Sequence, residues 1–590
     1  MRRVIIAAAL LLCGAAISAQ NLNPTVQVTN AFKGTDLAGE KLTVPMAVPD
    51  SLLKFDWDFN YSVFDNPYKG AYEFTPYLIE MRPDPVPYDG HKFYLRAGAG
   101  YSLHPELQAM FNPSVGKNFT LSIYDDLTGY WGNYWEIQPI RIKQPNIYRA
   151  HQIDTFGGDR FDNRFGAAAR YDAAKAVVSF DGSLGYLHSS QSDLAAHSAL
   201  RPSASLDIAS RFSSPLSLGV RLSYSGTMDN VYGRCYVSGS PVKEIDSRMT
   251  EHDLGVQGAV SYGFASYHAF RLGASFGRIM SSWESKDGHT SHLTASPSYR
   301  FSNGRFSAAL GVKMSLIRPD FGPGKRVEET ETADTYKSRK LYPDASLRLE
   351  LIPEALAVDA KVTGGSYFNT YSSYLESNNF LSASLSEQYM SQLGDVTVNT
   401  FDASLGFSGR VKSKVQFAAR AGYGRYYNSP MEGIQRLYQG QPFFMEYDLS
   451  NYDLMYADAE GSWHSDALDA SFHMRLQEAV FSAVTTAFTL PKFVGSAAVT
   501  YNWHKRIYAG VGAEWMTDRI YDGDGEFALV KGFTCEVPGW VDLSANLEYR
   551  FSRKMSFWAK GGNLLGQTIM RNYGVAEKGP YATLGICLIL

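Results

Sequence analysis

The chain has 590 residues, a formal net charge of −4 and only 19% charged residues. This near-neutral balance excludes the strongly basic character that nucleic-acid binding requires. Aromatic residues reach 14%, with 38 Tyr and 34 Phe beside 52 Gly. Such a composition suits β-structure with aromatic side chains at membrane interfaces, and a large secreted all-β protein is the plainer alternative.

The N-terminus has the pattern of a secretory signal peptide. Arg2 and Arg3 precede an apolar run from Val4 to about Ile17, and Ser18-Ala19 follows. This pattern predicts cleavage near Ala19, so residues 1–19 form the signal peptide. No other segment approaches 18 consecutive apolar residues, so we expect no transmembrane helix. A secreted chain can still enter a membrane as a closed β-barrel, because closure satisfies every backbone group.

The stretch from Leu293 to Leu316 shows which kind of strand the chain forms. Apolar residues alternate with small or polar ones on both sides of Asn303-Gly304. Alternation of this kind marks a strand with two different environments, and Asn-Gly fits a type I′ hairpin turn with positive φ at both residues. The arms are about ten residues long, which matches a tilted strand that crosses a bilayer.

This pattern recurs along the chain, with short turns alternating with long polar stretches. Outer-membrane barrels show this asymmetry, with short periplasmic turns and long extracellular loops. We expect short turns near residues 173, 214, 265, 303, 353, 411, 465, 504 and 552. Irregular loops are expected at about 132–162, 188–203, 227–253, 281–291, 317–343, 369–400, 427–452, 479–492, 517–539 and 564–580.

The nine turns join eighteen strands, and four further segments bring the total to about 22. These segments are "FDWDFNYSVF" from Phe55, "KFYLRAGAGYSL" from Lys92, "NFTLSIYDDLTGYW" from Asn118 and "YATLGICLIL" from Tyr581. We therefore predict an all-β fold, a transmembrane antiparallel β-barrel of about 22 strands over residues 54–590. We expect residues 20–53 to form a periplasmic N-terminal arm, and we expect no N-terminal plug domain.

The hydrophilic face of the predicted strands carries charges of both signs. An Arg or Lys that faced lipid near the membrane centre would cost about 2–4 kcal/mol. These residues must therefore face a hydrated or filled lumen, with no clear preference for anions or cations. They are Arg300, Lys313, Arg348, Glu350, Asp359, Lys361, Arg420, Glu548 and Arg550.

The C-terminal segment "MSFWAKGGNLLGQTIMRNYG", with Asn563-Leu564-Leu565, and the last strand resemble the barrel of TonB-dependent receptors. More particularly, the chain resembles the plug-less barrels of this type in Bacteroidota. The resemblance implies an outer-membrane location in a Gram-negative bacterium, nutrient uptake and TonB as a candidate partner. The chain departs from the family in ending on Leu590 rather than on an aromatic residue.

The space before the predicted barrel is the second departure. About 35 residues separate the signal peptide from Phe55, too few for a plug domain. A separate periplasmic protein, the N-terminal arm or an inward-folded segment is expected to fill the lumen, and an open passage is the alternative. The expected partners are the outer-membrane lipid and a separate periplasmic plug or surface lipoprotein. A structural barrel that anchors a surface or periplasmic assembly is the alternative function.

We find no pattern that predicts catalysis. The sequence contains no G-x-S-x-G, H-E-x-x-H or P-loop motif, so we expect neither an enzyme nor a cofactor. One Gly-rich stretch holds Asp522, Asp524 and Glu526, whose alternating carboxylates can supply oxygen ligands to Ca²⁺. The simpler interpretation of this stretch is a flexible acidic hairpin tip.

Overall fold

The computed structural model describes residues 92–113, 115–116, 118–143, 147–191, 195–210, 215–235, 243–284, 286–320, 340–353, 355–378, 380, 396–411, 414–435, 444–482, 489–523, 533–571 and 575–590. The strands are β1 (Phe93–Tyr101), β2 (Glu106–Phe111), β3 (Phe119–Lys143), β4 (Ile147–Asp172), β5 (Ala176–Gln191), β6 (Ala195–Ser210), β7 (Leu216–Cys235), β8 (Lys243–Ala265), β9 (His268–Trp283), β10 (Lys286–Ser302), β11 (Phe306–Asp320), β12 (Lys340–Ile352), β13 (Leu356–Phe368), β14 (Val396–Val411), β15 (Val415–Gln435), β16 (Phe444–His464), β17 (Leu468–Phe481), β18 (Phe493–Trp503), β19 (Ile507–Met516), β20 (Arg519–Gly523), β21 (Phe533–Val537), β22 (Trp540–Arg550), β23 (Met555–Gly562), β24 (Val575–Glu577) and β25 (Tyr581–Ile589). One α-helix, α4 (Tyr371–Ser377), lies between β13 and β14.

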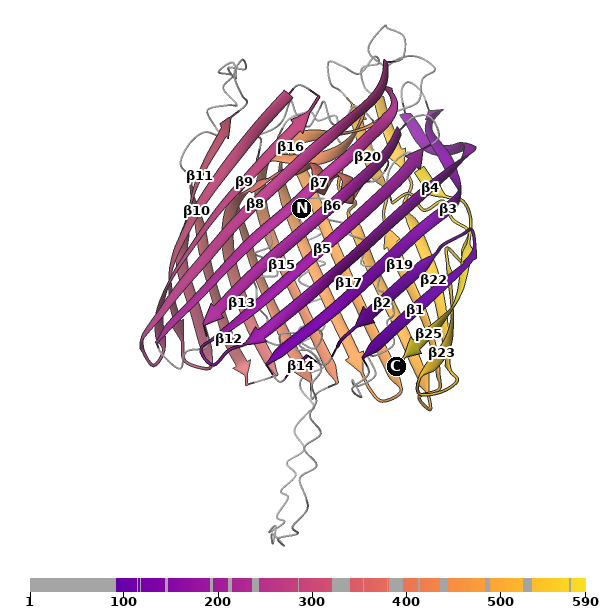
Figure 1. Ribbon diagram of the computed structural model, residues 1–590. Helices are drawn as coiled ribbons and strands as arrows, with labels where there is room; N and C mark the ends of the chain where they lie inside the picture. The colour runs from indigo at the N-terminus through magenta and orange to yellow at the C-terminus, as the bar shows by residue number, and fades with distance from the viewer. Residues whose placement is uncertain are drawn as a thin grey trace, which may run out of the picture. The chain divides into compact units, whose positions relative to one another are not determined.

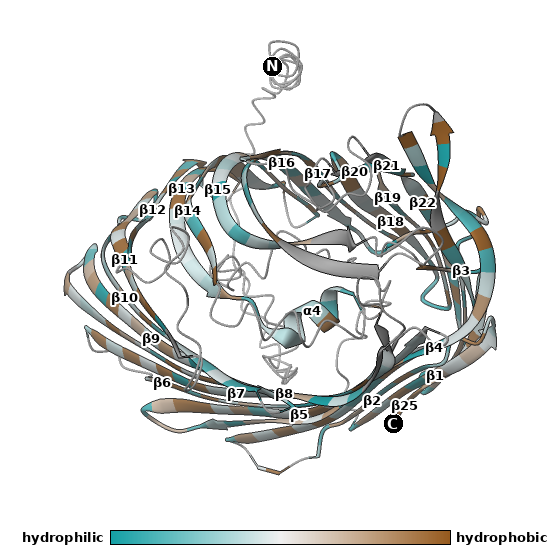
Figure 2. Cartoon of the chain, turned by 90° about the horizontal axis from the view of Figure 1, so that it is seen from above, coloured by the Kyte–Doolittle hydropathy of each residue, from teal (hydrophilic) through white to brown (hydrophobic). Residues whose placement is uncertain are grey.

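Twenty-two of these strands form one closed antiparallel ring. Each strand from β1 to β19 pairs with the next, and the ring continues through β22, β23 and β25. Strand β25 then pairs with β1, from Tyr94 opposite Ile589 to Tyr101 opposite Ala582. Figure 1 shows the tilted strands from the side, and Figure 2 shows the ring from above. The fold is the predicted 22-strand transmembrane barrel.

Closure of the ring explains why glycines occur where the first and last strands meet. Trp558 on β23 lies over Gly98 of β1 and Gly585 of β25, where an added Cβ would come within 2.4 Å of the indole ring. The Arg96 guanidinium stacks on the same ring at 4.1 Å. The Trp558 ring thus occupies the space that side chains at Gly98 and Gly585 would need. These two glycines are required for the close approach of the ring and not for chain flexibility.

The twenty-second strand is not the one that the sequence suggested. Strand β2 pairs with β1 on one side and β3 on the other, so the ring closes without the predicted strand Phe55–Phe64. That segment, the signal peptide 1–19, the arm 20–53 and the start of the predicted barrel lie outside the described residues. Strand β2 has only six residues, which is too short for a clear alternation to emerge.

All nine predicted short turns lie between consecutive ring strands, but several of the expected loops are strand over much of their described length. Strands β3 and β4 have 25 and 26 residues and cover most of the stretch 132–162. At about 3.3 Å per residue they extend roughly 80 Å, far more than a bilayer crossing needs. A polar stretch is usually interpreted as a loop. Here the polar residues belong to strands that continue the sheet beyond the membrane.

The turn at Asn303-Gly304 is also shifted by one residue from the prediction. Gly304 has φ +88°, whereas Asn303 is absent from the described non-glycine residues with positive φ. The Asn303 side chain instead accepts hydrogen bonds from the backbone N–H groups of Arg305 (3.2 Å) and Phe306 (2.8 Å). Gly304 and Arg305 are therefore the central residues, and glycine takes the first central position, as in a type II′ turn.

The two faces of the ring differ as the alternation requires. Large apolar side chains on one face are exposed to the surroundings, among them Val256 (46%), Leu310 (54%) and Leu405 (62%). Their strand neighbours on the other face are mainly small, polar or charged. A closed ring with an apolar outer belt is the form in which strands cross a bilayer. Among the described residues, no helix has the length and apolar character needed to cross a membrane.

A pair of adjacent substitutions in β8 tests the assignment of the faces. Val256 points outward, and Gln257 points inward, where it pairs with Arg221 and Ser275. We expect Val256→Arg to lower the free energy of unfolding by about 2–4 kcal/mol, because the charge enters hydrocarbon. Gln257→Arg should change it by much less. Equilibrium unfolding from lipid vesicles measures both, and equal losses would contradict the assignment.

Candidate functional site

The register places the nine charged residues singled out from the sequence on one face of the ring, opposite the exposed apolar side chains. Arg348 lies opposite Asp359, and Glu548 and Arg550 alternate with outward residues of β22. Lys313 Nζ lies 3.0 Å from Thr363 Oγ1 and 3.7 Å from Asp344. These nine residues form no single cluster, because they are distributed over β10–β13, β15 and β22.

Opposite charges are paired on the inner wall of β14–β17. Arg420 lies 2.9 Å from Asp458, and Arg475 reaches the same carboxylate at 3.7 Å. Between these strands Tyr456 donates a hydrogen bond to Asp402 at 2.7 Å. Paired charges leave little net potential, so this part of the wall does not select a substrate by the sign of its charge.

Helix α4 lies inside the ring, as the view from above shows (Figure 2). It has seven residues, and the side chain of Thr370 caps it by accepting a hydrogen bond from the Ser373 N–H at 3.1 Å. Three of its residues, Tyr371, Tyr374 and Leu375, are buried. A segment between two neighbouring strands, β13 and β14, thus enters the lumen.

Two buried carboxylates on the opposite wall hold α4. Glu251 on β8 accepts hydrogen bonds from the backbone N–H groups of Tyr371 (2.8 Å) and Ser372 (3.3 Å). Asp229 on β7 accepts a hydrogen bond from the Tyr371 hydroxyl at 2.7 Å and contacts His197 Nδ1 at 2.7 Å. Asp229 is 0% and Glu251 3% exposed. Hydrogen bonds to these buried carboxylates hold α4 in one position, because moving the helix would leave a buried charge without partners.

An apolar cluster joins α4 to other segments at the same end of the barrel. Along β8 toward this end of the barrel, Leu254 is the last large exposed apolar residue among those described. Glu251 lies three residues closer to the same end. The cluster thus lies beyond the apolar belt. Its buried members are Ile137, Ala150, Leu187, Ala199, Met249, Trp283, Tyr371, Tyr374, Leu375, Cys535, Val537, Met570 and Ala576. We call α4, β20–β21 and residues 563–571 and 575–577 the cap.

The Asn563-Leu564-Leu565 motif begins the third segment of the cap. Asn563 has φ +48°, a left-handed conformation that asparagine tolerates better than most residues. Its backbone N–H donates to Asp542 at 2.9 Å. Leu564 and Leu565 are exposed, so neither contributes to the buried cluster.

Arg571 fastens this segment to the wall. Its guanidinium lies 2.9 Å from Glu514 and 2.7 Å from Asp542. Burial alone would lower the pKa of Arg571, but the two carboxylates more than offset it and the pKa is raised. Arg571 is therefore charged at every physiological pH, and this contact does not respond to pH.

Strand β24 closes the wall above the short β1–β2 hairpin. It pairs with β3 from Tyr134 to Glu136, and Glu577 lies 3.5 Å from His104 in the hairpin turn. Burial, with smaller effects of Arg160 and Lys560, lowers the pKa of His104 to about 4. The imidazole is therefore neutral at pH 7, and its contact with Glu577 is a polar contact rather than an ion pair.

The three candidate calcium ligands are only partly within the described structure. Asp522 lies in β20, whose hairpin partner is β21, whereas Asp524 and Glu526 lie outside the described residues. No group of three His, Cys, Asp or Glu side chains that could hold a metal ion occurs within the described ranges.

The anchoring residues of the cap were not found from the sequence. Asp229 and Glu251 lie in a stretch that was interpreted as a loop, and His197 lies in another. Thr370 before "YSSYLES" was the available signal, because Thr is a common N-cap residue. A helix of seven residues is too short for its periodicity to stand out.

The comparison with known proteins gives matches in structure alone. No protein-family model matches the sequence, and no curated protein matches it. Among solved structures, the ferric-catecholate import receptor Fiu of Escherichia coli K12 has a TM-score of 0.58 at 10% identity, covering 85% of this chain and 82% of that one. FpvA of Pseudomonas aeruginosa, bound to heterologous pyoverdines, has a TM-score of 0.61 at 11% identity, with coverages of 85% and 72%. The copper transporter OprC has 0.59 at 12%, with coverages of 84% and 80%.

These matches show the fold. The chain shares the barrel fold of these import and transport proteins.

Removing one anchor tests how α4 is held. We expect Glu251→Ala to speed amide hydrogen exchange of residues 371–377 by about 10- to 100-fold, since hydrogen bonds to a charged group contribute about 1.5–3 kcal/mol. The matched control is Glu376→Ala, which removes a half-exposed carboxylate that contacts Arg201 at 3.6 Å and accepts a hydrogen bond from the Ser372 hydroxyl at 3.4 Å, but does not touch the buried anchors. Equal effects of the two variants on exchange would show that Glu251 is not an anchor.

Proposed function

We propose that the chain is an outer-membrane import receptor that moves or captures a nutrient, with its lumen closed from the extracellular side by the cap. The observation that carries the proposal is the attachment of α4, across the lumen, to Asp229 and Glu251 in a ring of twenty-two strands. A ring of this size without obstruction would be a wide aqueous channel. The fold similarity to import receptors supports uptake as the process.

The lining charges support a polar substrate. We infer that the face carrying Arg300, Lys313 and the other seven residues singled out from the sequence lines a hydrated passage below the cap. Both signs of charge occur there. Lys313 and Arg420 pair with carboxylates on neighbouring strands, and Arg550 pairs with Glu548 on its own strand. Such a wall suits a neutral or zwitterionic polar compound better than a strongly charged one.

The cap does not account for closure of the lumen on the periplasmic side. We propose that a separate periplasmic protein or the N-terminal segment fills the lower lumen, and that TonB supplies the energy for opening. The signal peptide 1–19 and the arm 20–53 also remain predictions. A scaffold role is the second candidate, and the long strands that extend beyond the apolar belt favour it, because they offer a large surface outside the membrane.

Ion conductance of the purified barrel in a planar bilayer tests the closure. We expect low conductance from the intact chain and a large, steady current when residues 371–377 are replaced by a short Gly-Ser linker, because α4 then no longer crosses the lumen. Glu376→Ala, which leaves the buried anchors intact, should stay closed. A steady open-pore current from the intact chain would overturn the proposed closure.

Calcium binding at the β20–β21 hairpin is a separate proposal. Titration calorimetry of the folded barrel with Ca²⁺ should show one site that is lost in the double variant Asp524→Asn/Glu526→Gln, since neutral side chains are weaker ligands for a hard cation. Unchanged heats in the double variant would leave the acidic residues as a plain hairpin tip.

A further inference from the structure

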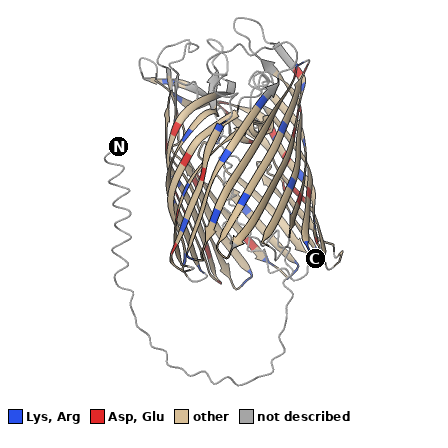
Figure 3. Cartoon of the chain, turned by 90° about the vertical axis from the view of Figure 1, so that its left-hand side faces the viewer, with Lys and Arg blue, Asp and Glu red and all other residues tan. Residues whose placement is uncertain are grey.

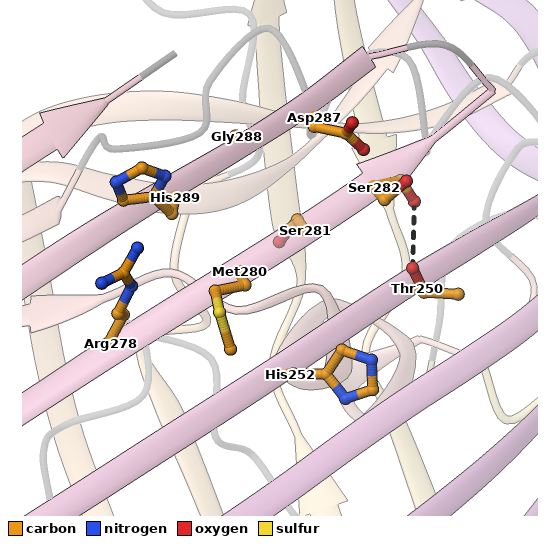
Figure 4. A pocket seen from close by; sticks show the side chains of 9 residues that line it. All are labelled: Thr250, His252, Arg278, Met280, Ser281, Ser282, Asp287, Gly288 and His289. Atoms are coloured by element: carbon orange, nitrogen blue, oxygen red, sulfur yellow. Dashed lines mark hydrogen bonds between the residues drawn. The ribbon is translucent and has the colours of Figure 1, made fainter. Parts of the chain in front are cut away.

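A pocket of about 300 Å³ lies among β8, β9 and β10. It is lined by Arg278, His252 and His289 together with Thr250, Ser282 and Asp287, and Figure 4 shows these side chains on neighbouring strands. None of these residues belongs to the cap or to the charged lumen face.

The register places the pocket on the outside of the barrel. Arg278 lies opposite Leu254, and two residues earlier Phe276 lies opposite Val256 and Leu293. These apolar side chains are all exposed, and side chains two residues apart on a strand share a face. Arg278 is therefore the first outward residue beyond the apolar belt on β9, at the level where lipid headgroups lie.

Arg278 has an unsatisfied hydrogen-bond donor in this position. Its Nε is buried and has no hydrogen-bond partner within the described part of the chain. A buried N–H of a charged group without an acceptor is costly, so the Arg278 side chain is stabilised when it turns to present this donor to an acceptor that enters the pocket. The pocket also holds His252, whose Nδ1 lies 3.0 Å from the Tyr224 hydroxyl.

A second arginine flanks the pocket on the same outer face. Ser291 pairs with Arg278 on one side and with Arg318 on the other, so the two arginines are separated by one strand. With about 4.8 Å between strands, their backbones lie roughly 10 Å apart. Arg318 is exposed, and Asp287 is the one carboxylate among the lining residues. Figure 3 shows both basic and acidic residues on the strands of this side of the ring.

We propose that this pocket binds a phosphate group of an outer-leaflet glycolipid. Arginine presents several N–H donors in a fixed fork that matches phosphate oxygens, which neutral headgroup atoms do not match as well. Phe276 and Leu293, directly below, supply apolar surface for an acyl chain. A free phosphate ion shares the headgroup chemistry but does not use this apolar surface.

Native mass spectrometry of the detergent-solubilised full chain tests the proposal. The probes are purified lipid A with both phosphates, its dephosphorylated form and inorganic phosphate. The variants are Arg278→Gln and, as matched control, Arg271→Gln, which removes an arginine from the opposite face of the same strand. Heat-modifiable electrophoretic mobility confirms that each variant is folded.

We expect the intact chain to retain phosphorylated lipid A. The Arg278→Gln variant should lose it about tenfold more readily, because charge-assisted hydrogen bonds are lost. Arg271→Gln should retain it as the intact chain does. Equal retention of the phosphorylated and dephosphorylated lipids by the intact chain would overturn the proposal, even if Arg278→Gln failed to fold. Displacement of the lipid by millimolar inorganic phosphate would assign the site to the free anion instead.

Discussion

The structure depends on one constraint, which is that a backbone N–H or C=O inside hydrocarbon must find its partner within the protein. The ring meets it by joining its two ends. Strand β25 pairs with β1 over eight residue pairs, and the N–H groups of Lys92 and Phe93 donate to the Leu590 carbonyl at 2.7 and 2.9 Å. Because these ends meet at the side of the short turns, the number of ring strands must be even.

Period-two alternation and turn chemistry were enough to predict the frame of the fold from the sequence. The closed barrel, twenty-one of its twenty-two strands and all nine short turns were found this way, because each depends on neighbours within a few residues. The sequence did not reveal β2, whose six residues are too few, or the continuation of β3 and β4 into polar sequence. The rule that polar residues indicate loops fails there, since a sheet outside the membrane can be polar on both faces.

The candidate site was the hardest part to predict, for a different physical reason. The anchors of the cap join residues that are 120 and 142 positions apart, as in the bonds from Tyr371 to Glu251 and Asp229. No local pattern records such a contact. The nine charged residues on the inner face were identified because a charge facing lipid is costly, which each strand shows by itself. Their lining of a passage remains a proposal, whereas their shared face follows from the register.

The barrel and the cap are held by different interactions, and this difference bears on how the molecule could open. The ring strands share continuous backbone hydrogen bonds that cannot be broken singly without exposing polar groups to lipid. The helix of the cap is held by side chains of Asp229 and Glu251 and by an apolar cluster, all in a region beyond the belt. Elements held in this way open locally at lower free energy than the frame that carries them. A ligand that replaced the bonds to these two carboxylates would release α4 while the ring remained intact, so the binding of a substrate and the opening of the lumen would depend on the same residues.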